Sequence, residues 1–129
     1  MRGRSKTDWW GVVLEARDGE ALASFYAGVL GWPSEKQGEG QAAIAVPGTS
    51  SYLAFESKPD YVPPVWPAAD GRQQMMMHLD VAVDDLAAAV AEAVELGATL
   101  AGYQPQEDVR VLLDPAGHPF CLYLDREPG

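Results

Sequence analysis

The sequence predicts an α+β domain made of two tandem βαβββ modules. The first observation is a repeated order of elements: an apolar strand, an aspartate, an amphipathic helix and a glycine occur twice. The second is spacing, because Asp18 and Asp84 are separated by as many residues as Gly31 and Gly97. The third is that proline and glycine pairs, which favour turns, divide the end of each half into further strands. Such internal duplication is the signature of a repeated architecture.

The first half contains each element of one module. Residues 12–16 form an apolar run typical of a strand, and Asp18 is the expected N-cap of a helix. The apolar face of this helix is predicted to consist of Leu22, Phe25, Tyr26, Val29 and Leu30. Gly31 should end the helix, because glycine accepts the left-handed conformation common after helix C-termini. One more strand is expected before residue 41, followed by strands at 41–46 and 51–56.

The second half repeats this pattern. Residues 78–83 predict a strand, Asp84 the N-cap of a helix and Gly97 its end. The apolar face of the second helix is predicted to consist of Leu86, Ala89, Val90, Ala93 and Val94. The remaining strands are expected at 99–103, 109–113 and 120–124.

The chain of 129 residues predicts a single domain at 1–129, with module one at about 10–57, a linker at 58–74 and module two at about 75–125. The prolines of the linker forbid a helix there and favour an extended chain. Each module has a sheet with one apolar face, so the two modules are expected to need one another for stability.

Composition and charge exclude several classes of protein. Hydrophobic residues make up 47% of the chain, which indicates a globular protein, and no apolar run is long enough to span a membrane. The single cysteine, Cys121, cannot form an intrachain disulfide, and no apolar signal segment is found, so a cytoplasmic protein is expected. The net charge of −10 disfavours nucleic acid as a partner and favours cationic ligands.

Three segments resemble the motifs of one known superfamily. They are Val12…Asp18…Phe25-Tyr26…Leu30-Gly31-Trp32, His78-Leu79-Asp80…Asp84-Asp85-Leu86…Leu96-Gly97-Ala98 and Asp114-Pro115-Ala116-Gly117-His118-Pro119. In this order they resemble the vicinal oxygen chelate superfamily, which has the glyoxalase/bleomycin resistance/dihydroxybiphenyl dioxygenase fold, and the proline-rich linker resembles that of its glyoxalase-like subgroup. The resemblance implies a curved mixed sheet cup that holds a small-molecule ligand. It also implies a homodimer, since many relatives dimerise.

The resemblance further implies positions for divalent metal ligands. Metal-dependent relatives place up to four His or Glu ligands on the first and last strands of the modules, and the matching positions here are Gly11, Tyr52, His78 and Cys121. Tyr52 is assigned by superposing the two hairpins, which sets it opposite Cys121. His78 is the only strong candidate ligand, because Gly11 has no side chain and a usual Zn²⁺ or Fe²⁺ site needs three or four donors. A divalent metal is therefore disfavoured, and the cofactor stays unassigned.

Strand alternation predicts which side chains face the cup. In the strand at 78–83, His78 and Asp80 share one face, and the apolar residues on the other face should contact the helix. The predicted lining of the cup is Glu15, Tyr52, His78, Asp80, Cys121 and Tyr123. Trp10, together with Trp9, is expected either to line the bottom of the ligand cleft or to cover an edge of the sheet.

Three functions stay open. In the first, the cup holds a small organic molecule, and if the protein is an enzyme the family implies lyase or isomerase chemistry at a carbonyl. His78 would then be the general base, and Asp80 or Glu15 would orient it or bind a cationic group, with Trp10, Tyr52, Cys121 and Tyr123 as ligand-binding residues. The alternative is a non-catalytic, bleomycin-resistance-like protein that sequesters a cationic drug. The third is an interaction domain with a vestigial cup.

Each of these residues also has a purely structural interpretation. His78 and Asp80 could form a hydrogen-bonded pair that only holds strands together, and Cys121 could be a small buried apolar residue. His118 is expected to be a turn residue. The three methionines at 75–77 are expected to pack in the core or between subunits, because methionine fills irregular gaps.

Overall fold

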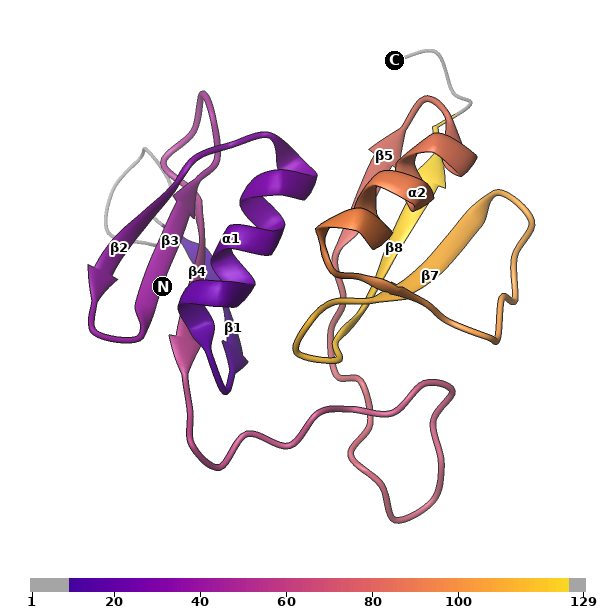
Figure 1. Ribbon diagram of the computed structural model, residues 1–129, viewed down its shortest axis with the longest axis horizontal. Helices are drawn as coiled ribbons and strands as arrows, with labels where there is room; N and C mark the ends of the chain where they lie inside the picture. Colours follow the sequence, from indigo (N-terminus) through magenta and orange to yellow (C-terminus); the bar gives the residue numbers. More distant parts are fainter. Residues whose placement is uncertain (1–9, 126–129) are drawn as a thin grey trace, which may run out of the picture. The chain divides into compact units, whose positions relative to one another are not determined.

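A computed structural model describes residues 10–125 of the chain (Figure 1). Trp9 and the basic N-terminal segment lie outside the described residues. The chain forms two compact units, which divide between Tyr61 and Val62. We call them the N-terminal unit and the C-terminal unit. Neither helix of the described part is long and apolar enough to cross a membrane.

The N-terminal unit is one βαβββ module. Its elements are β1 (Gly11–Ala16), α1 (Gly19–Leu30), β2 (Ser34–Gly38), β3 (Gln41–Ala45) and β4 (Tyr52–Ser57). The strand order in its sheet is β1-β4-β3-β2, with β1 parallel to β4 and the other pairs antiparallel. The helix lies across one face of this sheet (Figure 1).

The C-terminal unit repeats the same topology. Its elements are β5 (Asp80–Val83), α2 (Leu86–Leu96), β6 (Thr99–Leu100), β7 (Val109–Leu113) and β8 (Pro119–Leu124). The strand order is β5-β8-β7-β6, and β5 is parallel to β8. Identical order and strand directions in the two sheets confirm the predicted fold class and its duplication.

The helix ends follow the predicted chemistry with one correction. Asp18 caps α1, where its carboxylate accepts a hydrogen bond from the backbone N–H of Ala21 at 3.0 Å, and Gly31 follows the helix with a φ of 73°. The cap of α2 is Asp85 rather than Asp84. Its carboxylate accepts from the N–H of Ala88 at 3.0 Å, because α2 begins one residue later than predicted and so brings that amide within reach of Asp85.

Two strands of the C-terminal unit are shorter than predicted. His78 and Leu79 precede β5, which begins at Asp80. The last bond toward this end joins the N–H of Cys121 to the carbonyl of Leu79 at 2.9 Å. The next hydrogen bond of the ladder would need a backbone N–H at position 119 of β8. That residue is Pro119, which has none. The ladder therefore stops before His78.

The strand predicted at 99–103 is the two-residue β6. A side chain replaces its missing residues. The amide of Gln104 accepts from the N–H of Val111 and donates to the carbonyl of Val111, both at 2.8 Å. Gln104 thereby supplies the acceptor for the N–H of Val111 that a longer β6 would have supplied, while the carbonyl of Val111 also accepts from the backbone N–H of Ala101 at 3.1 Å.

The core of each unit lies between its helix and its sheet. In the N-terminal unit, the ring of Tyr26 stacks on Phe55 with centroids 5.9 Å apart, and Leu22 and Ile44 are buried beside them. In the C-terminal unit the buried side chains include Leu112, Phe120 and Leu122. Met76 and Met77 are exposed, so of the two alternatives expected for them, packing in the core is wrong and packing between subunits stays a prediction.

The alternation of side chains along β8 determines which residues lie on the face of the C-terminal sheet opposite α2. Phe120 and Leu122 are buried toward α2, and Cys121 and Tyr123 alternate with them. Along β5, Asp80 is exposed whereas Val81 is half-buried. The polar side chains of β5 and β8 therefore share the sheet face that α2 leaves uncovered.

Candidate functional site

A hollow of about 290 Å³ lies on this uncovered face of the C-terminal unit. We call it the acidic hollow. Its lining consists of His78, Asp80, Gln106, Asp108, Val109, Cys121, Tyr123 and Leu124. These residues come from the segment that leads into β5 and the start of that strand, from β8, and from the first residue of β7 and the loop before it. Four of them, His78, Asp80, Cys121 and Tyr123, were predicted to face a ligand.

Three chemically active side chains converge in the acidic hollow. The parallel register places Asp80 directly beside Cys121. His78 lies two residues before Asp80, and its Nε2 is 3.1 Å from Oδ1 of Asp80. One donor atom each of His78, Asp80 and Cys121 lies within 4.8 Å of the other two. An imidazole, a carboxylate and a thiol thus form one cluster, which we call the donor cluster.

The pKa of the Cys121 thiol is raised from its ordinary value. Burial is the largest cause, followed by the negative charge of Asp80 and a hydrogen bond to the Asp80 side chain. All three disfavour the thiolate. Since the thiolate is the nucleophilic form, Cys121 is a weak nucleophile near neutral pH. A role of Cys121 in covalent catalysis is accordingly disfavoured.

Replacing Asp80 by asparagine should make Cys121 more reactive. The substitution removes the charge that opposes ionisation, so the pKa of the thiol falls and more thiolate is present at any pH below it. Alkylation by iodoacetamide at pH 7.5 should accelerate about three- to tenfold, since one pKa unit changes the thiolate fraction about tenfold. Mass spectrometry reports this site alone because the chain has one cysteine. Glu92→Gln is the control and should leave the alkylation rate of Cys121 unchanged. If the alkylation rate of Asp80→Asn depends on pH as in the parent, the charge of Asp80 does not raise the pKa of the thiol.

The N-terminal unit contains a second hollow, of about 440 Å³, on its own sheet. Its lining consists of Pro33, Glu35, Gln37, Ala43, Ala45, Tyr52 and Ala54. Tyr52, predicted to bind ligand, belongs to this hollow. Glu15 does not line it and forms an ion pair with Lys58, whose Nζ lies 3.8 Å from Glu15 and 3.3 Å from Glu56. Trp10 is 59% exposed, and its carbonyl accepts a hydrogen bond from the N–H of Tyr52 at 3.3 Å.

The structure therefore divides the predicted site residues between the units. His78, Asp80, Cys121 and Tyr123 come together in the acidic hollow of the C-terminal unit. Glu15, Tyr52 and Trp10 belong to the N-terminal unit, where Lys58 rather than a histidine contacts the Glu15 carboxylate.

The four-ligand metal set implied by the family does not fit these residues. A Cβ atom added to Gly11 would overlap the ring of Tyr52, which occupies the space a side chain at position 11 needs. The strand register also corrects the assignment of Tyr52. Val13 and Asp80 each precede their helix-capping aspartate by five residues, and they pair with Ala54 and Cys121. Ala54, which cannot bind a metal, is thus the counterpart of Cys121.

Sequence reasoning missed Gln106 and Asp108 of the acidic hollow. They lie in an irregular loop, where neither strand alternation nor helical periodicity indicates the direction of a side chain. The carbonyl of Asp108 accepts from the N–H of Leu124 at 3.1 Å, which attaches the loop to the end of β8. The one available signal was position, because Asp108 directly precedes β7.

His118 belongs to the closing turn, as expected from the sequence, and does not line the acidic hollow. Its Nδ1 lies 2.9 Å from Oδ2 of Asp114, a buried carboxylate. Asp114 also accepts hydrogen bonds from the N–H groups of Ala116 and His118, at 2.9 and 3.0 Å. This second His–Asp pair therefore shapes the β7–β8 hairpin.

The chain is similar to proteins of one family. The sequence model described as "Glyoxalase-like domain" matches residues 11–123. No curated protein sequence matches the chain. Among solved structures, a glyoxalase/dioxygenase from Nostoc punctiforme has 20% identity and a TM-score of 0.65, covering 98% of this chain and 97% of that one.

Two further structures extend the comparison. A glyoxalase-related enzyme from Fulvimarina pelagi has 18% identity and a TM-score of 0.64, covering 89% of this chain and 86% of its own. An antibiotic-binding protein from a Streptomyces species has 18% identity and a TM-score of 0.57, covering 96% of this chain and 98% of its own. At these identities the likeness shows the fold.

Proposed function

Since the chain belongs to the glyoxalase-like domain family of the vicinal oxygen chelate superfamily, we propose that it binds a small organic cation in the acidic hollow without chemical turnover. The observation that carries this proposal is the charge of the lining. Asp80 and Asp108 both contribute carboxylates, and no lysine or arginine is among the described residues that line the hollow. Among these described lining residues the basic side chain is His78, and it is paired with Asp80.

The other lining residues suit the same ligand. Tyr123 brings an aromatic ring, whose face attracts cations by about 0.5–2 kcal/mol depending on desolvation. The volume of about 290 Å³ is at the lower end for small-molecule pockets, so it fits a small cation or the cationic end of a larger drug. The net charge of −10 adds a long-range attraction for cations.

One comparison and one structural observation support binding over catalysis. A protein of the same fold from a Streptomyces species is described as antibiotic-binding. In addition, Gly11 and Ala54 take positions at which the N-terminal module would otherwise supply metal ligands. Sequestration of a cationic drug is therefore the function that the site residues favour.

Choline and 3,3-dimethylbutan-1-ol test this proposal, because they have the same shape and differ in a single positive charge. Choline should bind about five- to thirtyfold more tightly, since a cation near a carboxylate and an aromatic face gains about 1–2 kcal/mol. NMR titration of the full chain measures both affinities, with the largest shifts expected at Asp80, Asp108 and Tyr123. Bleomycin serves as the larger cationic probe.

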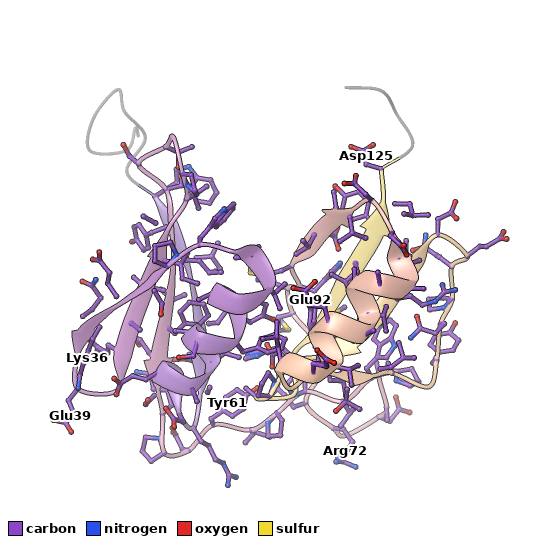
Figure 2. The ribbon with its side chains drawn as sticks, turned by 45° about the horizontal axis from the view of Figure 1, so that its top comes forward. Lys36, Glu39, Tyr61, Arg72, Glu92 and Asp125 are labelled. Carbon is purple, nitrogen blue, oxygen red and sulfur yellow. The ribbon has the colours of Figure 1, made fainter. Side chains whose placement is uncertain are left out.

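Matched variants locate the binding. Asp80→Asn and Asp108→Asn should each weaken choline binding, whereas Glu92→Gln, on the exposed side of α2 (Figure 2), changes the same net charge and should not. Equal affinity for the two probes, or shifts outside the acidic hollow, would refute the proposal.

The second candidate function is that of a lyase or isomerase, and the observation that favours it is the short distance between His78 and Asp80. Nε2 of His78 lies 3.1 Å from Asp80, a carboxylate that could orient the ring for general-base catalysis, and the side chains are 38% and 57% exposed. The test is turnover of the methylglyoxal–glutathione hemithioacetal by protein supplied with divalent metal. Turnover that His78→Ala abolishes would establish the enzyme and rule out a function of binding alone.

A further inference from the structure

We propose that Arg110 is a positioning residue of the acidic hollow. Its guanidinium holds the backbone of residues 106–108, which we call the 106–108 loop, so that the carboxylate of Asp108 faces a bound cation. The role toward the cation rests on the function proposed above, whereas the hold on the loop does not depend on it. Arg110 is not among the residues that line the hollow, so it acts on the ligand through Asp108.

The strand register places the Arg110 side chain on the face of the sheet opposite the hollow. Val109 pairs with Tyr123, and both line the hollow. Arg110 pairs with Leu122, which is buried toward α2. Directly opposed residues of antiparallel strands direct their side chains to the same face, so Arg110 leaves β7 on the α2 side. It can therefore hold the loop without competing with the cation for the carboxylates.

Three backbone carbonyls accept hydrogen bonds from one guanidinium nitrogen, Nη1 of Arg110. They belong to Gln106, Glu107 and Val109, at 3.3, 2.9 and 2.8 Å. The carbonyl between the last two, that of Asp108, accepts from the N–H of Leu124 at 3.1 Å. All carbonyls from residue 106 to residue 109 are thus bonded, and one side chain supplies most of the donors. Bonds from a charged donor are also stronger than those between neutral groups.

The 106–108 loop has no regular backbone structure that would fix it in another way. Gln106 and Asp108 lie between β6 and β7, and β6 pairs with β7 only through Leu112 and Leu113. Without the guanidinium, the carbonyl of Gln106 loses the donor that ties it to β7. We therefore expect the loop to open locally when Arg110 is replaced, which lets the Asp108 carboxylate leave the hollow.

Choline titration followed by NMR tests this role, because charge and position predict opposite results. Arg110→Gln removes a positive charge, and the electric field alone would then strengthen the binding of a cation. Loss of positioning should instead weaken choline binding by about three- to tenfold, the contribution of one partly buried carboxylate. Arg72→Gln makes the same change in charge at an exposed residue (Figure 2) and should stay within about twofold of the parent.

The two carboxylates of the hollow distinguish positioning from a general loss of structure. Asp80 is held by the register of β5 with β8 and does not depend on the loop. Within Arg110→Gln, adding Asp108→Asn should cost less than about twofold in affinity, whereas adding Asp80→Asn should cost as much as in the parent. Choline should likewise still shift the amide signal of Asp80 and no longer that of Asp108. Equal costs of Asp108→Asn in the two backgrounds, or tighter choline binding by Arg110→Gln, would overturn the proposal.

Proteolysis of the full chain tests the loop without a ligand. Glutamyl endopeptidase cleaves after glutamate, and the carbonyl of Glu107 is one that Arg110 binds. Cleavage after Glu107 should accelerate at least about fivefold in Arg110→Gln, because proteases cut backbone that opens locally. Glu39, between β2 and β3, is the internal control, and cleavage after it should not change.

The two measurements separate this proposal from the proposed function. If the parent binds choline no better than its neutral analogue, the cation function fails, and faster cleavage after Glu107 would still establish the hold of Arg110 on the loop. If cleavage after Glu107 is as slow in Arg110→Gln as in the parent, Arg110 does not hold the loop, whatever the affinity for choline.

Discussion

Replacing Asp114 by alanine should lower the free energy of unfolding by about 3–4 kcal/mol. Asp114 is 4% exposed, and its carboxylate accepts hydrogen bonds from the N–H groups of Ala116 and His118 and contacts Nδ1 of His118 at 2.9 Å. Each hydrogen bond to a charged group contributes about 1.5–3 kcal/mol, and its loss leaves partly buried donors without an acceptor. Few single substitutions outside the apolar core have effects of this size.

Urea denaturation of the full chain, followed by circular dichroism, measures this loss. His118→Ala removes one of the partners and should cost about 1–2 kcal/mol. Asp60→Ala, at an exposed position, should stay within about 0.5 kcal/mol of the parent. A change below about 1 kcal/mol in Asp114→Ala would show that the carboxylate does not hold the hairpin.

The same turn explains how the sequence motif relates to the site. Asp114-Pro115-Ala116-Gly117-His118 sits between β7 and β8 and brings Val111 opposite Cys121. The motif predicted a hairpin at this place, because proline and glycine favour turns. The sequence did not reveal that Asp114 would be buried with several donors around it, since that depends on how the turn folds back on itself.

The N-cap of α2, at Asp84-Asp85, shows what a local sequence pattern cannot predict. Either aspartate can cap a helix, and apolar periodicity predicts the helix without choosing between them. The choice depends on which carboxylate reaches an amide of the first turn, and that is Asp85. A shift of one residue is invisible to composition but decides which side chain is used in the cap.

Alternation predicted more of the site than any motif did. It placed His78 and Asp80 on one face and Cys121 and Tyr123 on one face of another strand, and these four residues line one hollow. The meeting of Asp80 with Cys121 could not be predicted, because it depends on the parallel register of two strands far apart in the chain. For the same reason, the ring of Tyr52 over Gly11 was unforeseen.

Replacing Asp80 by lysine should lower choline affinity by about 30- to 150-fold, equivalent to about 2–3 kcal/mol. The change removes an attractive charge and adds a repulsive one on the face of the hollow. An isolated pair of charges 4 Å apart interacts by about 4 kcal/mol at an effective dielectric constant of 20, but Asp80 is 57% exposed, so solvent reduces this value. Stability should change by less than about 0.5 kcal/mol, because the position is exposed.

Glu92→Lys is the control that separates a local effect from a global one. It changes the net charge by the same amount from the exposed side of α2 (Figure 2), so it tests the long-range field alone. That field is screened within about 8–10 Å at physiological salt, so Glu92→Lys should weaken choline binding by less than about twofold. Equal losses in the two variants, both vanishing at high salt, would mean that the acidic surface attracts cations without a site. A large loss confined to Asp80→Lys would place the cation beside the donor cluster, where the thiol of Cys121 is also held.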